Sequence, residues 1–103
     1  PRPPAAPTLC FVVPCMGRLA HLKRSLPAAA AQPGCRVVVV DYSCPDGAGD
    51  WAERHYPAAR VVRVPGRATF HLAAARNAGA AAAGTPWVCF LDADVVVAPN
   101  FAA

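Results

Sequence analysis

The most regular feature of the chain is a series of four short apolar runs, separated by longer segments that contain Ala and Leu. Runs of this length that are rich in Val and bounded by Pro or Gly predict β-strands. They cover residues 9–13, 36–40, 60–64 and 87–91, and Pro14 is expected to end the first. The second and fourth runs are apolar at both alternating positions, so these strands are expected to be buried on both faces.

The segments between the runs have the pattern of helices. The apolar positions that share one face of a helix over residues 18–31 are Leu19, Leu22, Leu26 and Ala29. A short helix is expected around residues 50–55, and an alanine-rich helix over residues 71–83 that ends at Gly84. This alternation predicts an α/β fold. We expect a Rossmann-like three-layer α/β/α arrangement with a mostly parallel sheet in the strand order 3-2-1-4.

Candidate site residues follow three of the four predicted strands. Pro14-Cys15 follow the first strand, Asp41 follows the second, and Asp92-Ala93-Asp94 follow the fourth. The carboxyl ends of parallel strands share one edge of the sheet, and the expected strand order puts a ligand crevice between strands one and four. The sequence therefore predicts that these residues meet at one site.

Asp92 and Asp94 flank a single residue directly after the fourth apolar run. Two carboxylates offer the hard oxygen ligands that Mg²⁺ and Mn²⁺ prefer. Their neighbours are apolar, and two close carboxylates in such surroundings would be costly without a cation or hydrogen-bond donors. The favoured interpretation is therefore a divalent cation that carries a phosphate. The alternative is a surface turn in which Asp94 caps a following helix.

Other polar residues have two possible roles each. Asp41 could accept a hydrogen bond from a base or ribose, or it could serve an Asx-type turn or a helix start. Arg76, within the alanine-rich helix, could face the crevice and meet a nucleotide, or it could extend to solvent. The histidines are expected at the surface or as helix caps rather than as catalysts; they are His21, His55 and His71.

Composition narrows the class of protein. With 103 residues, 55% of them hydrophobic, the chain is at most one domain with a packed core. The net charge of +4 comes from basic residues that form no run, which gives no indication of nucleic-acid binding. No apolar run approaches the roughly 20 residues that span a membrane.

The chain ends and the cysteines give further expectations. Residues 1–8 have the composition of a Pro-rich linker or tail, and residues 9–103 form the domain, which looks like a piece of a longer protein. The five cysteines include no CxxC pair, which argues against a disulfide framework or a structural zinc site. Cys10, Cys35 and Cys89 are expected as small core residues, and a reducing cytoplasm is the expected location.

Four motifs together resemble the nucleotide-sugar-binding half of family 2 glycosyltransferases. They are Phe11-Val12-Val13-Pro14, Val38-Val39-Val40-Asp41, Ala75-Arg76-Asn77-Ala78-Gly79 and Phe90-Leu91-Asp92-Ala93-Asp94. The resemblance covers the chain from Leu9 onward. It implies the GT-A fold, inverting sugar transfer, a nucleotide-diphospho-sugar donor, for which a UDP-sugar is expected, and Mn²⁺ or Mg²⁺ as the cofactor. The acceptor, whether glycan, lipid or protein, is not implied.

The resemblance also implies roles for individual residues around the nucleotide. Pro14 and its neighbour Cys15 would line the base pocket, and Asp41 would contact uracil or ribose. Arg76 would approach the nucleotide. The family often has a second Asp where this chain has Tyr42, so the contact to the base is expected to differ here.

For the metal, the resemblance implies that Asp92 lies near the ribose and the cation, and that Asp94 coordinates the cation directly. The cation would neutralise the diphosphate leaving group. The family's acceptor-binding half and its general base lie beyond the Asp-x-Asp segment. The fragment alone is therefore expected to bind its donor weakly and to transfer sugar poorly.

Two alternatives remain at this stage. The segment over residues 91–96 also resembles the first motif of haloacid-dehalogenase-type phosphatases, in which Asp92 would be the nucleophile. That motif normally follows the first strand of its domain, whereas three strand–helix units precede it here. The other alternative is a non-catalytic module that binds a nucleotide or a partner.

Overall fold

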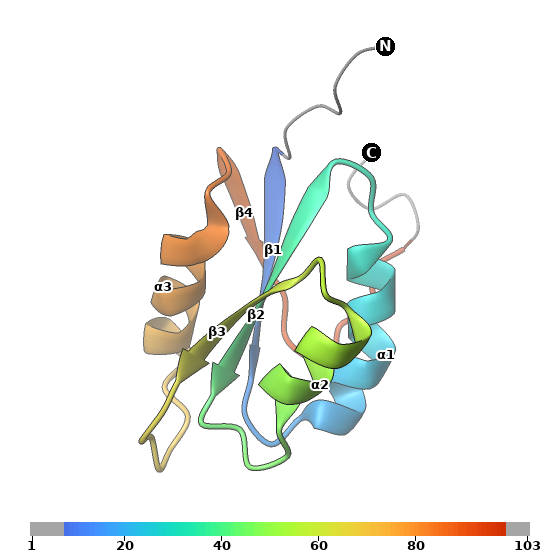
Figure 1. Ribbon diagram of the computed structural model, residues 1–103. Coiled ribbons are helices and arrows are strands. Elements are labelled where there is room, and N and C mark those ends of the chain that lie inside the picture. Colours follow the sequence, from blue (N-terminus) through green and yellow to red (C-terminus); the bar gives the residue numbers. More distant parts are fainter. Residues whose placement is uncertain (1–7, 99–103) are drawn as a thin grey trace.

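The computed structural model describes residues 8–98 and shows a parallel sheet with helices on both faces (Figure 1). The strands are β1 (Leu9–Cys15), β2 (Cys35–Tyr42), β3 (Arg60–Val64) and β4 (Trp87–Phe90), and the helices are α1 (Leu19–Ala30), α2 (Ala48–His55) and α3 (Leu72–Ala83). The strand order is β3-β2-β1-β4, and all neighbouring pairs are parallel. The predicted α/β fold and strand order are therefore confirmed. The predicted tail at residues 1–8 lies, apart from Thr8, outside the described residues.

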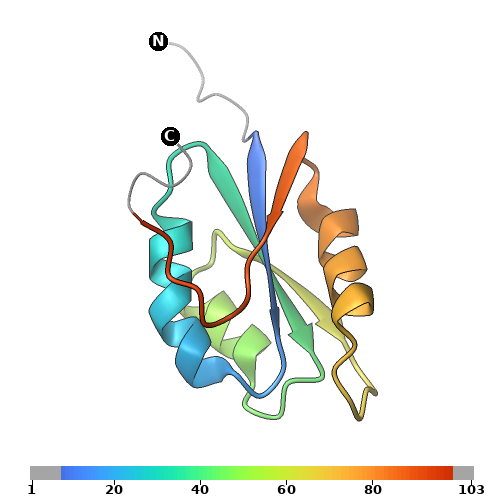
Figure 2. The same ribbon diagram turned by 180° about the vertical axis from the view of Figure 1, so that it is seen from behind.

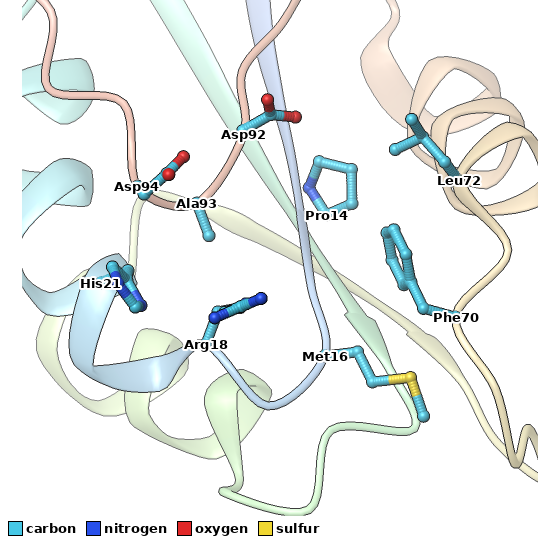
Figure 3. Close-up of a pocket in the computed structure, with 9 residues that line it drawn as sticks. All are labelled: Pro14, Met16, Arg18, His21, Phe70, Leu72, Asp92, Ala93 and Asp94. Carbon is cyan, nitrogen blue, oxygen red and sulfur yellow. The ribbon is translucent and has the colours of Figure 1, made fainter.

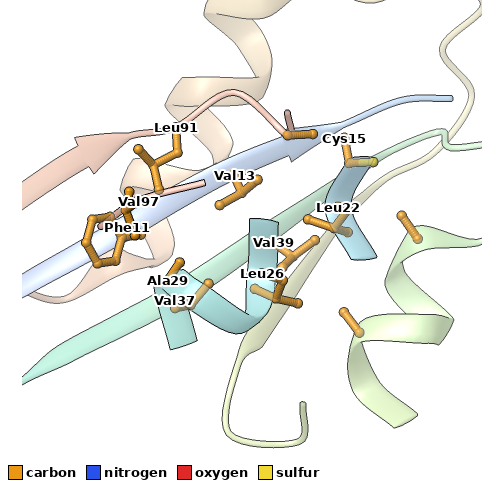
Figure 4. Close-up of a cluster of buried hydrophobic side chains, with 13 residues drawn as sticks. Phe11, Val13, Cys15, Leu22, Leu26, Ala29, Val37, Val39, Leu91 and Val97 are labelled. Carbon is orange, nitrogen blue, oxygen red and sulfur yellow. The ribbon is translucent and has the colours of Figure 1, made fainter. Parts of the chain in front are cut away.

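Each face of the sheet has its own apolar core. On one face, the strands pack against α1 and α2 through Phe11, Val13, Val37, Val39, Leu22 and Leu26, among others (Figure 4). On the opposite face, they pack against α3 through Cys10, Val12, Val38, Val40, Ala75 and Ala83, among others. No valine of β2 is more than 5% exposed. The expectation that this strand is buried on both faces is confirmed.

Helix α3 lies unusually close to the sheet because of one small residue. A Cβ atom at Gly79 would collide with the side chain of Val12 and would lie 2.9 Å from Val40 Cγ2. Only a glycine allows the helix backbone this approach. Gly79 belongs to the Ala-Arg-Asn-Ala-Gly motif, so part of that motif serves packing. His71 caps the start of α3 by accepting from Ala74 N, as one of the two expected roles of the histidines.

The expectation that Pro14 ends the first strand was wrong, since β1 continues to Cys15. Leu91 N donates to Val12 O at 2.9 Å, so the backbone groups of Val12 face β4. Pro14, two residues on, faces the same way, but the pairing with β4 ends at Val12 opposite Phe90. The missing N–H of Pro14 therefore falls beyond the partner strand and interrupts no ladder.

The expectation that the fourth strand is covered on both faces was also wrong. Within residues 8–98, β4 pairs with β1 alone, and it forms one edge of the sheet. Trp87 is 71% exposed and Phe90 is 41% exposed. An apolar run shows that a strand is suited to burial, but coverage also depends on which elements flank it.

The segment after β4 returns along α1, on the far side of the sheet from α3 (Figure 2). Ser25 Oγ on α1 donates to Ala93 O at 2.6 Å, and Gln32 Nε2 donates to Ala98 O at 2.8 Å. Leu91, Ala93 and Val97 are nearly buried in the α1-side core. These contacts fix the position of the Asp-Ala-Asp segment relative to α1.

All five cysteines are free thiols. Cys10 is buried, and Cys35 and Cys89 are half-buried against the core, which agrees with their expected role as small core residues. Over the described range, no helix combines the length and the hydrophobicity that a membrane crossing requires.

Candidate functional site

A cavity of about 380 Å³ opens between the ends of β1 and β4 (Figure 3). The residues that line it come from the end of β1, the start of α1, the loop before α3 and the segment after β4; they are Pro14, Met16, Arg18, His21, Phe70, Leu72, Asp92, Ala93 and Asp94. This is the switch point of the sheet, where the sequence predicted a crevice. Its volume is typical of a small-molecule site.

Asp92 and Asp94 both line the cavity, and both are exposed. Ala93 between them is buried, and Val95 N donates to Asp92 O to close a turn. The segment buries Ala93 and directs the carboxylates outward, so the cost expected from their apolar neighbours does not apply to them. The alternative of a helix cap is also absent, since residues 95–98 are not helical.

The two carboxylates fit a hard divalent cation but do not complete its coordination. Across residues 8–98, no group of three or more His, Cys, Asp and Glu side chains is arranged to hold a metal ion. Mg²⁺ is often held by one or two carboxylates together with phosphate oxygens and water. The donor set at Asp92 and Asp94 suits a cation that arrives with a phosphorylated ligand.

Arg76 lies on α3 beside the end of β4. Its Nη2 is 4.0 Å from Asp92 Oδ1, and its guanidinium carbon lies 5.4 Å from the centre of the Phe90 ring. The Nε atom is buried and has no hydrogen-bond partner in the described part of the chain. Arg76 does not line the cavity itself. Its contact with the exposed carboxylate of Asp92 adds little stability.

Asp41 lies apart from this cavity. Its Oδ1 accepts from Cys44 N at 2.9 Å, and its Oδ2 accepts from Gly49 N at 2.9 Å and from Arg63 Nη1 at 3.3 Å. The side chain therefore holds both the turn after β2 and the start of α2, which is the structural role considered for it. Asp41 instead borders a second, smaller hollow of about 180 Å³, together with Arg63.

Arg63 connects three acidic groups and was not singled out by the sequence. Besides Asp41, it donates from Nη2 to Asp50 at 2.9 Å and to Glu53. These contacts tie β3 to the start of α2 and to the end of β2. The only signal in the sequence was a charged residue inside a run of valines, which is also compatible with an exposed edge position.

Cys15, which was predicted to line the base pocket, is buried and does not line the cavity, and Tyr42 beside Asp41 is buried too. The thiol of Cys15 is 1% exposed, and burial together with the nearby Cys44 raises its pKa to about 12. Tyr42, also buried, meets Phe70 edge to face with ring centres 5.4 Å apart. Phe70 lines the cavity, so Tyr42 supports the cavity wall from behind.

Several lining residues were missed by sequence reasoning. They are Met16, Arg18, His21, Phe70 and Leu72. His21 is exposed, as expected, but it faces the cavity. The available signal was the spacing of Arg18 and His21, which are three residues apart directly after the loop of the first strand and so share a helix face.

The fold is a three-layer parallel α/β domain with an open cavity and two carboxylates at its switch point, where ligands bind in domains of this class. Residues 10–102 match the family model described as Glycosyl transferase family 2, and the chain belongs to this family. The match includes the Asp-Ala-Asp segment and gives no support to the phosphatase alternative. No curated protein sequence is significantly similar to the chain.

Solved structures share the fold of the chain. Similar structures include residues 1–349 of TarS from S. aureus, solved without a named ligand and in complex with UDP. Both have a TM-score of 0.75 and 21% identity to this chain, and they cover 89% and 90% of it. At this level of identity, the likeness establishes the fold. The chain spans 29% of the length of these structures.

Proposed function

We propose that the chain is the donor-binding part of an inverting glycosyltransferase that uses a UDP-sugar together with a divalent cation held by Asp94 and Asp92. The observation that carries this proposal is the switch-point cavity, which combines an apolar wall with two exposed carboxylates in a family 2 chain. A structure with the same fold is a complex with UDP, which makes UDP the natural probe.

The two sides of the cavity suit the two parts of a nucleotide. Pro14, Met16, Phe70 and Leu72 form an apolar wall against which a base or ribose would pack. In this proposal, the diphosphate and its cation bind at Asp92 and Asp94 on the other side of the cavity. Any nucleotide contact from Asp41 or Cys15 is proposed on the family resemblance alone.

The cofactor in this proposal is Mn²⁺ or Mg²⁺. When bound, the cation would act as a Lewis acid that stabilises the negative charge of the leaving diphosphate. Asp94 would hold it directly, and Arg76 would orient Asp92 beside it.

The remaining features of the enzyme concern the whole protein. Since the chain spans 29% of the TarS structures, the general base, the acceptor and the complete transfer reaction are placed outside it in this proposal. The chain alone is expected to bind donor without efficient sugar transfer. A cytoplasmic location is part of the proposal and is compatible with five free thiols.

The test is a calorimetric titration of UDP into the chain with Mn²⁺ and with EDTA, repeated on Asp94→Asn. Binding should require Mn²⁺ and should weaken by about tenfold or more in Asp94→Asn, since a charged ligand group is lost. Asp46→Asn is the matched control, because Asp46 is exposed, lies outside the cavity and loses the same charge. UDP binding that is equal in EDTA would refute the cation site. Absence of UDP binding under all conditions would refute the donor role of this chain.

A further inference from the structure

We infer that Arg18 and His21 form an anion-binding wall of the switch-point cavity, where they contact the diphosphate of the donor; this deepens the proposed function and rests on it. Arg18 is the residue directly before α1, His21 lies in the first turn of the helix, and both side chains line the cavity. Figure 3 shows Arg18 reaching into the cavity below Asp92 and Asp94, with His21 beside it.

The charge of the site requires a further cation. Asp92 and Asp94 together carry the charge that one divalent cation neutralises, so a metal held by both would contribute no net positive charge. A diphosphate bound there would keep its own negative charge, and a cationic side chain beside it would stabilise that charge. Arg18 is a permanent cation on the same cavity, and its guanidinium fork matches phosphate oxygens.

Arg18 and His21 are also available for a ligand. Within residues 8–98, neither side chain makes a hydrogen bond or an ion pair, and both are exposed. By contrast, Arg76 is engaged with Asp92, and Arg63 with three acidic groups. The acids and bases of the cavity therefore face one space without pairing across it. A ligand with both a bound cation and anionic oxygens would fill that space.

The test compares three probes in the presence of Mn²⁺: UDP, uridine and inorganic pyrophosphate. Arg18→Gln should weaken UDP and pyrophosphate binding by about tenfold, equivalent to about 1.4 kcal/mol, and should leave uridine binding unchanged. Arg24→Gln is the matched control, because Arg24 is exposed on the same helix and lies outside the cavity. This variant should bind all three probes like the parent chain. His21→Gln should have a smaller effect in the same direction as Arg18→Gln.

Each other outcome has a defined meaning. UDP binding by Arg18→Gln that equals the parent's overturns the inference, and so does an equal loss for UDP and uridine. Arg18→Lys keeps the positive charge but lacks the forked guanidinium group, so it should bind UDP with an affinity between those of the parent and Arg18→Gln. It provides a second test in case Arg18→Gln does not fold. If pyrophosphate binding depends on Arg18 but UDP binds no more tightly than pyrophosphate, the nucleotide proposal fails and the anion wall stands. If uridine and UDP bind equally, the anion wall fails and the nucleoside site stands. If none of the probes binds, both fail.

Discussion

Replacing Asp41 with Asn is expected to destabilise the chain by about 2–3 kcal/mol, and the value follows from its hydrogen bonds. Each carboxylate oxygen accepts a backbone N–H, from Cys44 and from Gly49, both at 2.9 Å. Asn has a single side-chain oxygen, so its NH₂ group must face one of these N–H groups. At a residue that is 8% exposed, an unsatisfied donor costs about 1–3 kcal/mol. The weakened contact to Arg63 adds less than about 1 kcal/mol, because Arg63 is half exposed and keeps its other partners.

The assay is urea unfolding followed by far-UV circular dichroism, with Asp46→Asn as the control. Asp46 lies in the same loop and is exposed, so its substitution should change the unfolding free energy by less than about 0.5 kcal/mol. For a chain of this size, the expected loss in Asp41→Asn corresponds to a Tm lower by roughly 10–20 °C. An Asp41→Asn variant as stable as the parent would refute this reasoning. In that case the Asp41 carboxylate of the parent chain would not be needed for the fold and could serve a ligand. UDP titration of the folded variant then tests a ligand role separately from the structural one.

Two further substitutions test the packing of the sheet. Gly79→Ala should lower the unfolding free energy by about 1–2 kcal/mol although Ala is the better helix former, since the added methyl group collides with Val12 and crowds Val40. Urea unfolding measures this change, with Ala81→Gly at an exposed position of the same helix as the control. A Gly79→Ala variant more stable than the parent would contradict the expectation. The pKa of Cys15 is raised from 9.0 to about 12, so the folded chain retains a proton that the unfolded chain releases, and this contribution to stability is complete below pH 9 and is lost as the pH rises toward 12. Between pH 8 and pH 10.5, urea unfolding should therefore show a smaller loss of stability for Cys15→Ala than for the parent chain. Equal losses in the two proteins would count against the raised pKa of Cys15.

The fold could be predicted because its determinants are local and repetitive. Alternating apolar runs define the strands and helices, and the handedness and order rules of parallel sheets leave few arrangements for them. The errors arose where the outcome depends on a distant element. Pro14 continues its strand because β4 ends before it reaches that position, and β4 is half exposed because it has a neighbour on one side in the described chain. The residues around Pro14 do not show where β4 ends, and the residues of β4 do not show how many strands flank it.

For the candidate site too, some residues could be predicted from the sequence and others depend on distant elements. Asp92 and Asp94 could be found because their chemistry is contained in adjacent positions after an apolar run. Arg18, His21 and Phe70 could not, because they line the cavity only through the path of α1 and of the loop before α3. Tyr42 shows the difference clearly. From the sequence it is a departure from the family pattern, whereas in the structure it supports Phe70 behind the cavity wall.

The ends of the parallel strands therefore have two different uses in this chain. At the end of β2, the carboxylate of Asp41 is engaged by backbone N–H groups and by Arg63, and this builds the loop. At the ends of β1 and β4, the carboxylate of Asp94 and the basic side chains of Arg18 and His21 face a common cavity and, within residues 8–98, have no partner in the protein. Exposed side chains without partners in the protein contribute little to the stability of the fold. In the proposed function, a metal-bound diphosphate would supply a cation to Asp94 and anionic oxygens to Arg18 and His21 at the same time.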